Sequence, residues 1–344
     1  MARRTAKPVN LALQGGGAHG AFTWGVLDHL LADDRLRITG ISGTSAGAMN
    51  AVALAAGWVE NGAEGARAAM ARFWRSMSDA ARLSPVRRSP IDMILGTWSL
   101  AASPGYHAAD ALSRTFSPYL LNPLNLNPLL DLLEDSIDFD KVRACDAFDL
   151  FISATNVETG RVKVFDRAEL TAEMVMASAC LPFLYQAVEI DGVPYWDGGY
   201  MGNPSLFPLH RANDCSDIVI VQINPVVRRG TPMNAHDIQN RMNEIAFNAS
   251  LLKELRSIDF VARLIEEGRL GATDYRHQRL HMIENQEALI PFGAASKMNA
   301  EWAFLEKLRD LGRETAARWL DDTHDRIGRE QTIDIRAMFQ GDDD

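Results

Sequence analysis

The chain has 344 residues, of which 47% are apolar and 23% are charged, a composition typical of a globular protein with a large core. Its formal charge of −10 argues against nucleic acid as the main partner, because little of the chain could neutralise phosphates in bulk. The three cysteines, Cys145, Cys180 and Cys215, are widely separated and form no C-x-x-C pair, so they predict neither a disulfide framework nor a zinc site. This cysteine content is most consistent with a reduced, cytoplasmic compartment.

No membrane span or signal peptide is predicted. The longest weakly polar run, residues 46–59, contains Asn50 and is shorter than the roughly 20 apolar residues that cross a bilayer. The apolar stretch at residues 9–13 is too short for the core of a signal peptide.

A first strand is predicted at residues 9–14, followed directly by a glycine-rich turn and a helix over residues 21–31. Within that turn Gly15, Gly17 and Gly20 satisfy the dinucleotide-binding pattern G-x-G-x-x-G. That pattern also requires an acidic residue at the end of the second strand, which is missing here. A nucleotide-binding module is therefore an alternative from another functional class.

The second strand, at residues 36–42, leads into a G-x-S-x-G turn, residues 43–47, and then into a helix over residues 48–56 with Gly57 as its expected C-cap. Strand, tight turn and helix form the setting of a nucleophile elbow, in which Ser45 would expose its hydroxyl. The helix N-terminus behind Ser45 adds partial positive charge where an oxyanion would form.

The two turns are expected to face each other. If the first two strands are adjacent and parallel, both turns emerge at the same carboxyl edge of the sheet. Consecutive glycines expose backbone N–H groups, which a tetrahedral oxyanion needs. The glycine-rich turn and Ser45 would then form one site.

Residues 61–81 are predicted to be helical, and residues 83–133 form an insertion in which six prolines separate short apolar segments. Such segments are not expected to form regular core helices. The insertion could cap an acyl pocket, contact lipid or polymer, or pack irregularly on the core.

Further strands are predicted at residues 148–155, 161–165 and 216–224, with one more at 280–284 in an otherwise helical C-terminal part. A hairpin over residues 188–196 turns at an Asp-Gly pair and delivers Asp197, Gly198 and Gly199 at its end. The alternation of strands and helices indicates an α/β fold.

The motifs so far do not identify the residue that would act as the base for Ser45. A triad would use one of the histidines after Asp197, and none of them has a distinctive local context: His210, His236, His277, His281 and His324. Asp197 lies on a short turn between a strand and two glycines, and burial beside Ser45 would raise its pKa toward that of a useful base. Metal binding is not predicted, because His277 and His281 lack the H-E-x-x-H pattern.

Taken together, these motifs resemble the patatin-like phospholipase family. Its hallmarks are a G-G-G-x-[RK]-G turn, a G-x-S-x-G elbow and a late D-G-[GA] turn, and this chain has all three in the family order. The motif positions are Gly15, Gly16, Gly17, Gly20, Gly43, Ser45, Gly47, Asp197, Gly198 and Gly199. Residues 177–183 and 203–204 also look like family blocks.

The resemblance implies a mostly parallel central sheet flanked by helices in a three-layer, patatin-like architecture. It implies a Ser-Asp dyad, with Ser45 as nucleophile and Asp197 as base, and an oxyanion hole from the N–H groups of Gly15, Gly16 and Gly17. No metal and no cofactor is implied. One departure is His19, where the family has Arg or Lys and where a cation would exist only if the histidine were protonated.

We therefore expect a serine acyl-ester hydrolase acting on fatty-acyl esters of lipids or phospholipids, located in the cytoplasm, with peripheral membrane contact left open. An esterase for storage polyesters or other carboxylic esters, and a catalytically silent lipid-binding protein, are the alternatives. The catalytic domain is predicted at residues 8–210, including the insertion, with residues 211–335 closing the same fold and an acidic tail at 336–344.

Overall fold

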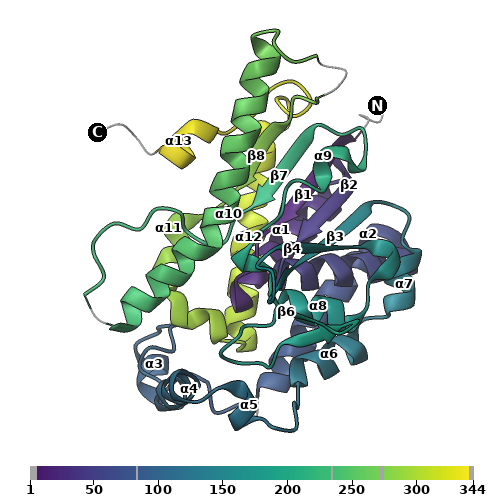
Figure 1. Ribbon diagram of the computed structural model, residues 1–344. Helices are drawn as coiled ribbons and strands as arrows, with labels where there is room; N and C mark the ends of the chain where they lie inside the picture. The colour runs from purple at the N-terminus through teal and green to yellow at the C-terminus, as the bar shows by residue number, and fades with distance from the viewer. Residues whose placement is uncertain (1–5, 83, 234, 272–274, 341–344) are drawn as a thin grey trace.

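The computed structural model describes residues 6–82, 84–233, 235–271 and 275–340, and its centre is one eight-stranded sheet (Figure 1). The strand order is β5-β6-β3-β2-β1-β7-β8, with β4 paired to β3. The strands are β1 (Lys7–Leu13), β2 (Leu36–Gly43), β3 (Asp149–Asn156), β4 (Val162–Asp166), β5 (Val188–Ile190), β6 (Val193–Asp197), β7 (Asp217–Val221) and β8 (Arg279–Ile283).

Most of the sheet is parallel. Strands β3, β2, β1, β7 and β8 run in one direction, whereas β4, β5 and β6 are antiparallel to their neighbours. The parallel pairing of β1 with β2 was expected from the sequence, and it brings the ends of both strands to the same edge. The predicted α/β class with a mostly parallel sheet is confirmed.

Helices cover both faces of the sheet (Figure 1). The α-helices are α1 (Gly20–Asp33), α2 (Ala46–Ala81), α3 (Pro90–Ile94), α4 (Pro104–Thr115), α5 (Pro118–Leu121), α6 (Pro128–Ser136), α7 (Phe139–Ala144), α8 (Ala172–Ser178), α9 (Leu209–Ala212), α10 (Ala235–Glu266), α11 (Gln286–Leu289), α12 (Trp302–Thr323) and α13 (Ile335–Gln340). Short 3-10 helices are η1 (Gly17–His19), η2 (Arg167–Glu169), η3 (Gly198–Tyr200), η4 (Ile290–Phe292) and η5 (Ala294–Met298).

The side-chain alternation of the central strands produces three layers. On β1, Leu11 and Leu13 join the large core under α1, α2 and α12, whereas Ala12 joins the second core under α10. Strand β7 divides in the same way, with Val219 on the first face and Ile220 on the second. Both faces of the central strands are therefore buried, which explains why these strands are continuously apolar.

The helix after the G-x-S-x-G turn does not end at Gly57, contrary to the expectation from the sequence. It continues to a break at Asn61 and Gly62, where the backbone leaves helical geometry, and then resumes to Ala81. A Cβ on Gly57 would collide with the carbonyl oxygen of Gly65. Gly57 thus permits the close crossing of two helical segments instead of capping one.

Four of the six prolines of the insertion start helices instead of interrupting them. Each of α3, α4, α5 and α6 has a proline at its first position, where the missing N–H costs nothing. The residues before these prolines are Ser89, Ser103, Ser117 and Asn127, all N-cap residues. As expected of a segment outside the core, α4 contains no buried residue, whereas α6 buries Leu132 and Leu133 in the large core, contrary to that expectation.

At the C-terminal end, residues 335–340 form α13, and Met338 and Phe339 pack against the second core. Residues 341–344 of the predicted acidic tail lie outside the described residues. The described helices include none with both the length and the apolar character that a bilayer span needs.

The caps of the insertion give a direct test of this arrangement. Ser103 accepts a hydrogen bond from the N–H of Tyr106, whereas the Ser117 side chain makes no such bond. We expect Ser103→Ala to lower the free energy of unfolding by about 1 kcal/mol in urea titrations. Ser117→Ala is the matched control with a smaller expected loss, and equal losses would contradict the assigned caps.

Candidate active site

The glycine-rich turn at the end of β1 lies against the turn that carries Ser45. A Cβ on Gly15 would stand 2.6 Å from the Cβ of Ser45, so only glycine allows this approach. The N–H of Gly15 donates to Oδ1 of Asn203 at 2.7 Å, and Nδ2 of Asn224 donates to the carbonyl of Gly15 at 2.6 Å. The first glycine of the turn is therefore fixed from both sides.

The next two glycines differ from Gly15. Within the described residues, the N–H groups of Gly16 and Gly17 have no acceptor, and both residues are reached by solvent. Gly17 has a φ of +59°, in the left-handed region that favours glycine. A Cβ there would also collide with the backbone of Lys297. The sequence G-G-G thus leaves two adjacent amide donors open at this edge of the sheet.

Ser45 occupies a strained turn between β2 and α2. Its φ of 54° and ψ of −120° are rare for a residue other than glycine, and such strain is typical of functional sites. The turn is tight because a Cβ on Gly47 would collide with the carbonyl of Leu13, at the end of β1. The N–H of Ser45 donates to Oγ of Ser178 at 2.9 Å. The side chain of Ser45 is half-buried between otherwise buried neighbours.

Asp197 lies at the end of β6, opposite Ala154 of β3, and is only 3% exposed. Its Oδ1 accepts a hydrogen bond from the N–H of Gly199 at 2.7 Å. Burial raises the pKa of Asp197 to about 7, against the opposing effects of the Gly199 N–H and of the nearby Ser45 side chain. A carboxyl group of this kind can exchange a proton near neutral pH.

The structure therefore brings Ser45, Asp197 and the glycine-rich turn together. It also adds polar residues that the sequence did not single out. Gln14 uses Oε1 to accept from the N–H groups of Ile223 and Asn224, and Nε2 to donate to the carbonyl of Asn203 at 3.1 Å. Asn203 and Ser178 lie in the blocks that resembled the family, which was the one available signal for them.

His19 is buried and neutral. Its Nε2 lies 2.7 Å from Oγ of Ser296, and burial together with the charge of Lys297 lowers its pKa to about 3. His19 therefore carries no positive charge at neutral pH. Beside this turn lies Lys297, whose Nζ donates to Oδ1 of Asn224 at 2.7 Å and whose pKa is lowered by burial. Nothing in the local sequence around residue 297 pointed to this position.

The histidines that follow Asp197 in the sequence, which a Ser-His-Asp triad would use, lie against other partners. His281 lies on β8 and pairs with Asp217 at 3.0 Å, and His277 lies 3.3 Å from Glu266. His324 lies beside Asp325, and His210 is half-buried in α9. The side chain of His236 is outside the described residues.

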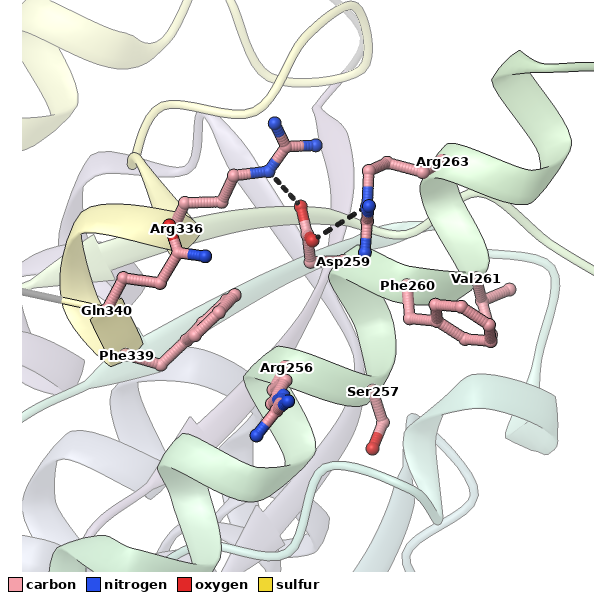
Figure 2. Close-up of a pocket in the computed structure, with 9 residues that line it drawn as sticks. All are labelled: Arg256, Ser257, Asp259, Phe260, Val261, Arg263, Arg336, Phe339 and Gln340. Carbon is pink, nitrogen blue, oxygen red and sulfur yellow. Dashed lines mark hydrogen bonds and ion pairs between the residues drawn. The ribbon is translucent and has the colours of Figure 1, made fainter.

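A cavity of about 540 Å³ lies between α10 and α13, where Arg263 and Arg336 both pair with Asp259 (Figure 2). None of the residues that line it belongs to the turns at Gly15, Ser45 or Asp197. This cavity is therefore separate from the candidate active site.

The fold and this geometry describe an α/β protein with a serine on a strained G-x-S-x-G turn at the carboxyl edge of its sheet. The chain matches the family model of patatin-like phospholipase over residues 11–212, more than half of its length, and it belongs to that family. The family resemblance of the three motifs is confirmed. At the level of the family, this makes the chain a lipid acyl hydrolase, an ester hydrolase.

Comparison with solved structures gives distant similarities. VipD from Legionella pneumophila has a TM-score of 0.42 and 14% identity, covering 91% of this chain and 67% of that one. The type III effector ExoU has a TM-score of 0.35 and 13% identity, with coverages of 93% and 54%. Full-length ExoU from Pseudomonas aeruginosa in complex with SpcU has a TM-score of 0.32 and 14% identity, with coverages of 92% and 53%. The chain thus spans about half the length of the ExoU chains. Among curated proteins no match is found.

The raised pKa of Asp197 predicts a pH-dependent stability. Between its ordinary pKa of 3.8 and about 7, the folded protein holds this proton more tightly than the unfolded chain, so stability falls as pH rises through that window. An asparagine at this position cannot ionise, so it removes the free-energy cost of a buried charge. We expect Asp197→Asn to unfold in urea with a free energy higher by on the order of 2–4 kcal/mol at pH 8, with the gain vanishing near pH 4. A gain that is independent of pH would contradict burial as its cause.

Proposed function

We propose that the protein hydrolyses fatty-acyl esters of lipids or phospholipids through a Ser-Asp dyad, with Ser45 as nucleophile and Asp197 as base. The observation that carries this proposal is the buried carboxyl group of Asp197, whose pKa of about 7 responds to the nearby Ser45 side chain. A serine needs a base that can reach its hydroxyl and whose pKa lies near the working pH. The burial and the raised pKa of Asp197 support it as that base.

In the first half of the reaction, Oγ of Ser45 attacks the acyl carbonyl while its proton moves to the carboxylate of Asp197. The tetrahedral intermediate collapses, and the departing alcohol takes the proton from Asp197. The acyl group remains on Ser45 as an ester. In the second half, Asp197 accepts a proton from water as the water oxygen attacks the acyl-enzyme. When the second tetrahedral intermediate collapses, the bond to Oγ of Ser45 breaks, Asp197 returns the proton to that oxygen, and the fatty acid is released. Neither step requires a metal or a cofactor.

For the oxyanion hole, we propose the N–H groups of Gly16 and Gly17, a narrower set than the sequence implied. The N–H of Gly15 is engaged by Asn203, which favours a role for Gly15 in holding the turn. Two free, adjacent amides in a fixed turn match the need of an oxyanion for pre-aimed donors. We further propose that Lys297 replaces the family cation that His19 does not supply, acting through Asn224 on the carbonyl of Gly15.

The substrate is proposed at the level of a fatty-acyl ester. Phospholipid, lysophospholipid and neutral glyceride all present the same reacting group, as does a storage polyester. The cytoplasmic location also remains a proposal, and it is supported by the three cysteines, which are all free and buried.

The dyad is tested by hydrolysis of a p-nitrophenyl acyl ester. We expect Ser45→Ala to reduce the rate to background and Asp197→Asn to reduce it by about 10²–10⁴-fold, because each removes one partner of the proton transfer. The matched control is Asp191→Asn in the β5–β6 turn, an exposed carboxylate that should leave the rate unchanged.

Substantial activity in Asp197→Asn would contradict the dyad. Loss of activity on replacing a single histidine, with the fold intact, would favour a Ser-His-Asp triad. Saturable nucleotide binding in calorimetry without any ester hydrolysis would favour the nucleotide-binding alternative. Vesicle binding that survives Ser45→Ala, with no turnover in either form, would favour a silent lipid-binding protein.

A further inference from the structure

The insertion exposes an unusual amount of apolar surface. Of the 24 large hydrophobic side chains that are exposed in the described parts of the chain, 11 lie between residues 91 and 126, with exposed fractions from 44% to 84%. They are Ile91, Met93, Ile94, Leu95, Leu112, Phe116, Tyr119, Leu120, Leu121, Leu124 and Leu126, which we call the apolar face. Contiguous apolar surface on a monomer marks a contact site.

The apolar face belongs to a fixed element. Arg88 forms an ion pair with Glu301, and the ring of Trp98 stacks on Phe304 at 5.3 Å. At the other end, Nε2 of Gln186 donates to the carbonyl of Asn122 at 2.7 Å. The helices between these anchors make the lower edge of the molecule in Figure 1. The exposed side chains therefore project from a folded element that is held at both ends.

Both anchors adjoin the candidate active site. At the first anchor, the carbonyl of Trp98 accepts a hydrogen bond from Nδ2 of Asn299. Asn299 is close in sequence to Lys297, and Gly17 of the glycine-rich turn packs against Lys297. The second leads from Gln186 to Cys180, whose carbonyl accepts from the N–H of Asp197. The insertion thus spans from the side of the glycine-rich turn to the side of Asp197.

Exposed apolar side chains also occur close in sequence to Asp197. Phe183 is 62% exposed and Leu184 is 38% exposed, shortly after Cys180, and Met201 is 41% exposed just after Gly199. The segments on either side of Asp197 therefore add to the exposed apolar residues of the protein.

The charge of this side differs from that of the whole protein. Residues 93–109 and 115–130 contain no Asp, Glu, Lys or Arg. The insertion carries Arg87, Arg88 and Arg114 against Asp92, Asp110 and Asp131, so it has no net charge in a chain of net charge −10. A charge-poor apolar surface without net negative charge, on an acidic protein, suits contact with lipid chains under anionic headgroups.

We propose that the apolar face docks the protein onto the surface of a phospholipid bilayer and so presents lipid acyl esters to Ser45. The proposal rests on the proposed function for its purpose, and on the exposed side chains, their anchors and the local charge for its location. A water-soluble ester reaches Ser45 without the bilayer, whereas a bilayer lipid reaches it only after docking. The docking step and the chemical step are therefore separable.

The test uses the full chain with sedimentation of vesicles made of phosphatidylcholine, alone or with about a third phosphatidylglycerol. Ile94→Asp/Leu124→Asp changes two of the most exposed side chains of the apolar face. The matched control is Val59→Asp/Phe260→Asp, which adds the same charge at exposed apolar positions of α2 and α10. We expect the first variant to lower the vesicle partition coefficient by about tenfold or more and to lose vesicle hydrolysis, and the control to bind like wild type.

Further measurements separate this proposal from the proposed function. The variant Ile94→Asp/Leu124→Asp should still hydrolyse a water-soluble p-nitrophenyl ester and should have the melting temperature of wild type. The variant Ser45→Ala should bind vesicles like wild type. Vesicle binding without hydrolysis of any ester would support the docking proposal and contradict the proposed hydrolase activity. Wild-type protein that binds neither vesicle, or equal binding by both double variants, would overturn docking. A dimer in light scattering that becomes monomeric only in Ile94→Asp/Leu124→Asp, without vesicle binding, would assign the face to a contact between copies.

Discussion

The site depends on the burial of one carboxylate. Asp197 is 3% exposed, and the groups that stabilise its charge in the described structure are the uncharged backbone N–H of Gly199 and the uncharged side chain of Ser45. Burial disfavours its ionised form and raises its pKa to about 7. In the proposed mechanism, the same burial that disfavours the charge in the folded protein makes the group a better base for Ser45. The proposed activity and stability thus make opposite demands at this residue.

The backbone supplies the rest of the geometry. Parallel pairing of β1 with β2 places their two turns at one edge, and the absence of side chains at Gly15 and Gly47 lets the turns touch. Around them, Gln14, Asn203 and Asn224 satisfy the polar groups of the turn, so its shape is fixed by hydrogen bonds from several segments. Strands β7 and β8 and Lys297 come from beyond residue 212, where the family match ends. The C-terminal part of the chain therefore completes both the sheet and the support of the turn.

Much of the fold and of the candidate site could be predicted from the sequence, because local chemistry determines those parts. The buried strands, the Asp-Gly hairpin and both glycine-rich turns follow from apolar patterns and from residues with few backbone alternatives. The features that could not be predicted depend on contacts between distant segments. Gly57 looked like a helix end because its close contact with Gly65 is tertiary, and the use of the Gly15 N–H by Asn203 joins residues 188 positions apart. Likewise, a proline marks either the start of a helix or a break, and the preceding residue does not always distinguish the two. Pro90 follows a serine and starts α3, whereas Pro85 also follows a serine and starts no helix.

The central claim is that a buried carboxylate with a raised pKa activates Ser45, and the most direct measurement is the rate at which a fluorophosphonate modifies the protein. Intact-protein mass spectrometry would follow this rate from about pH 5 to about pH 9 in wild type and in Asp197→Asn. The account predicts one adduct, on Ser45, with a rate that rises through an apparent pKa near 7 and is far slower and without that rise in Asp197→Asn. An adduct at another residue, or the same rate and the same pH dependence in Asp197→Asn, would contradict it.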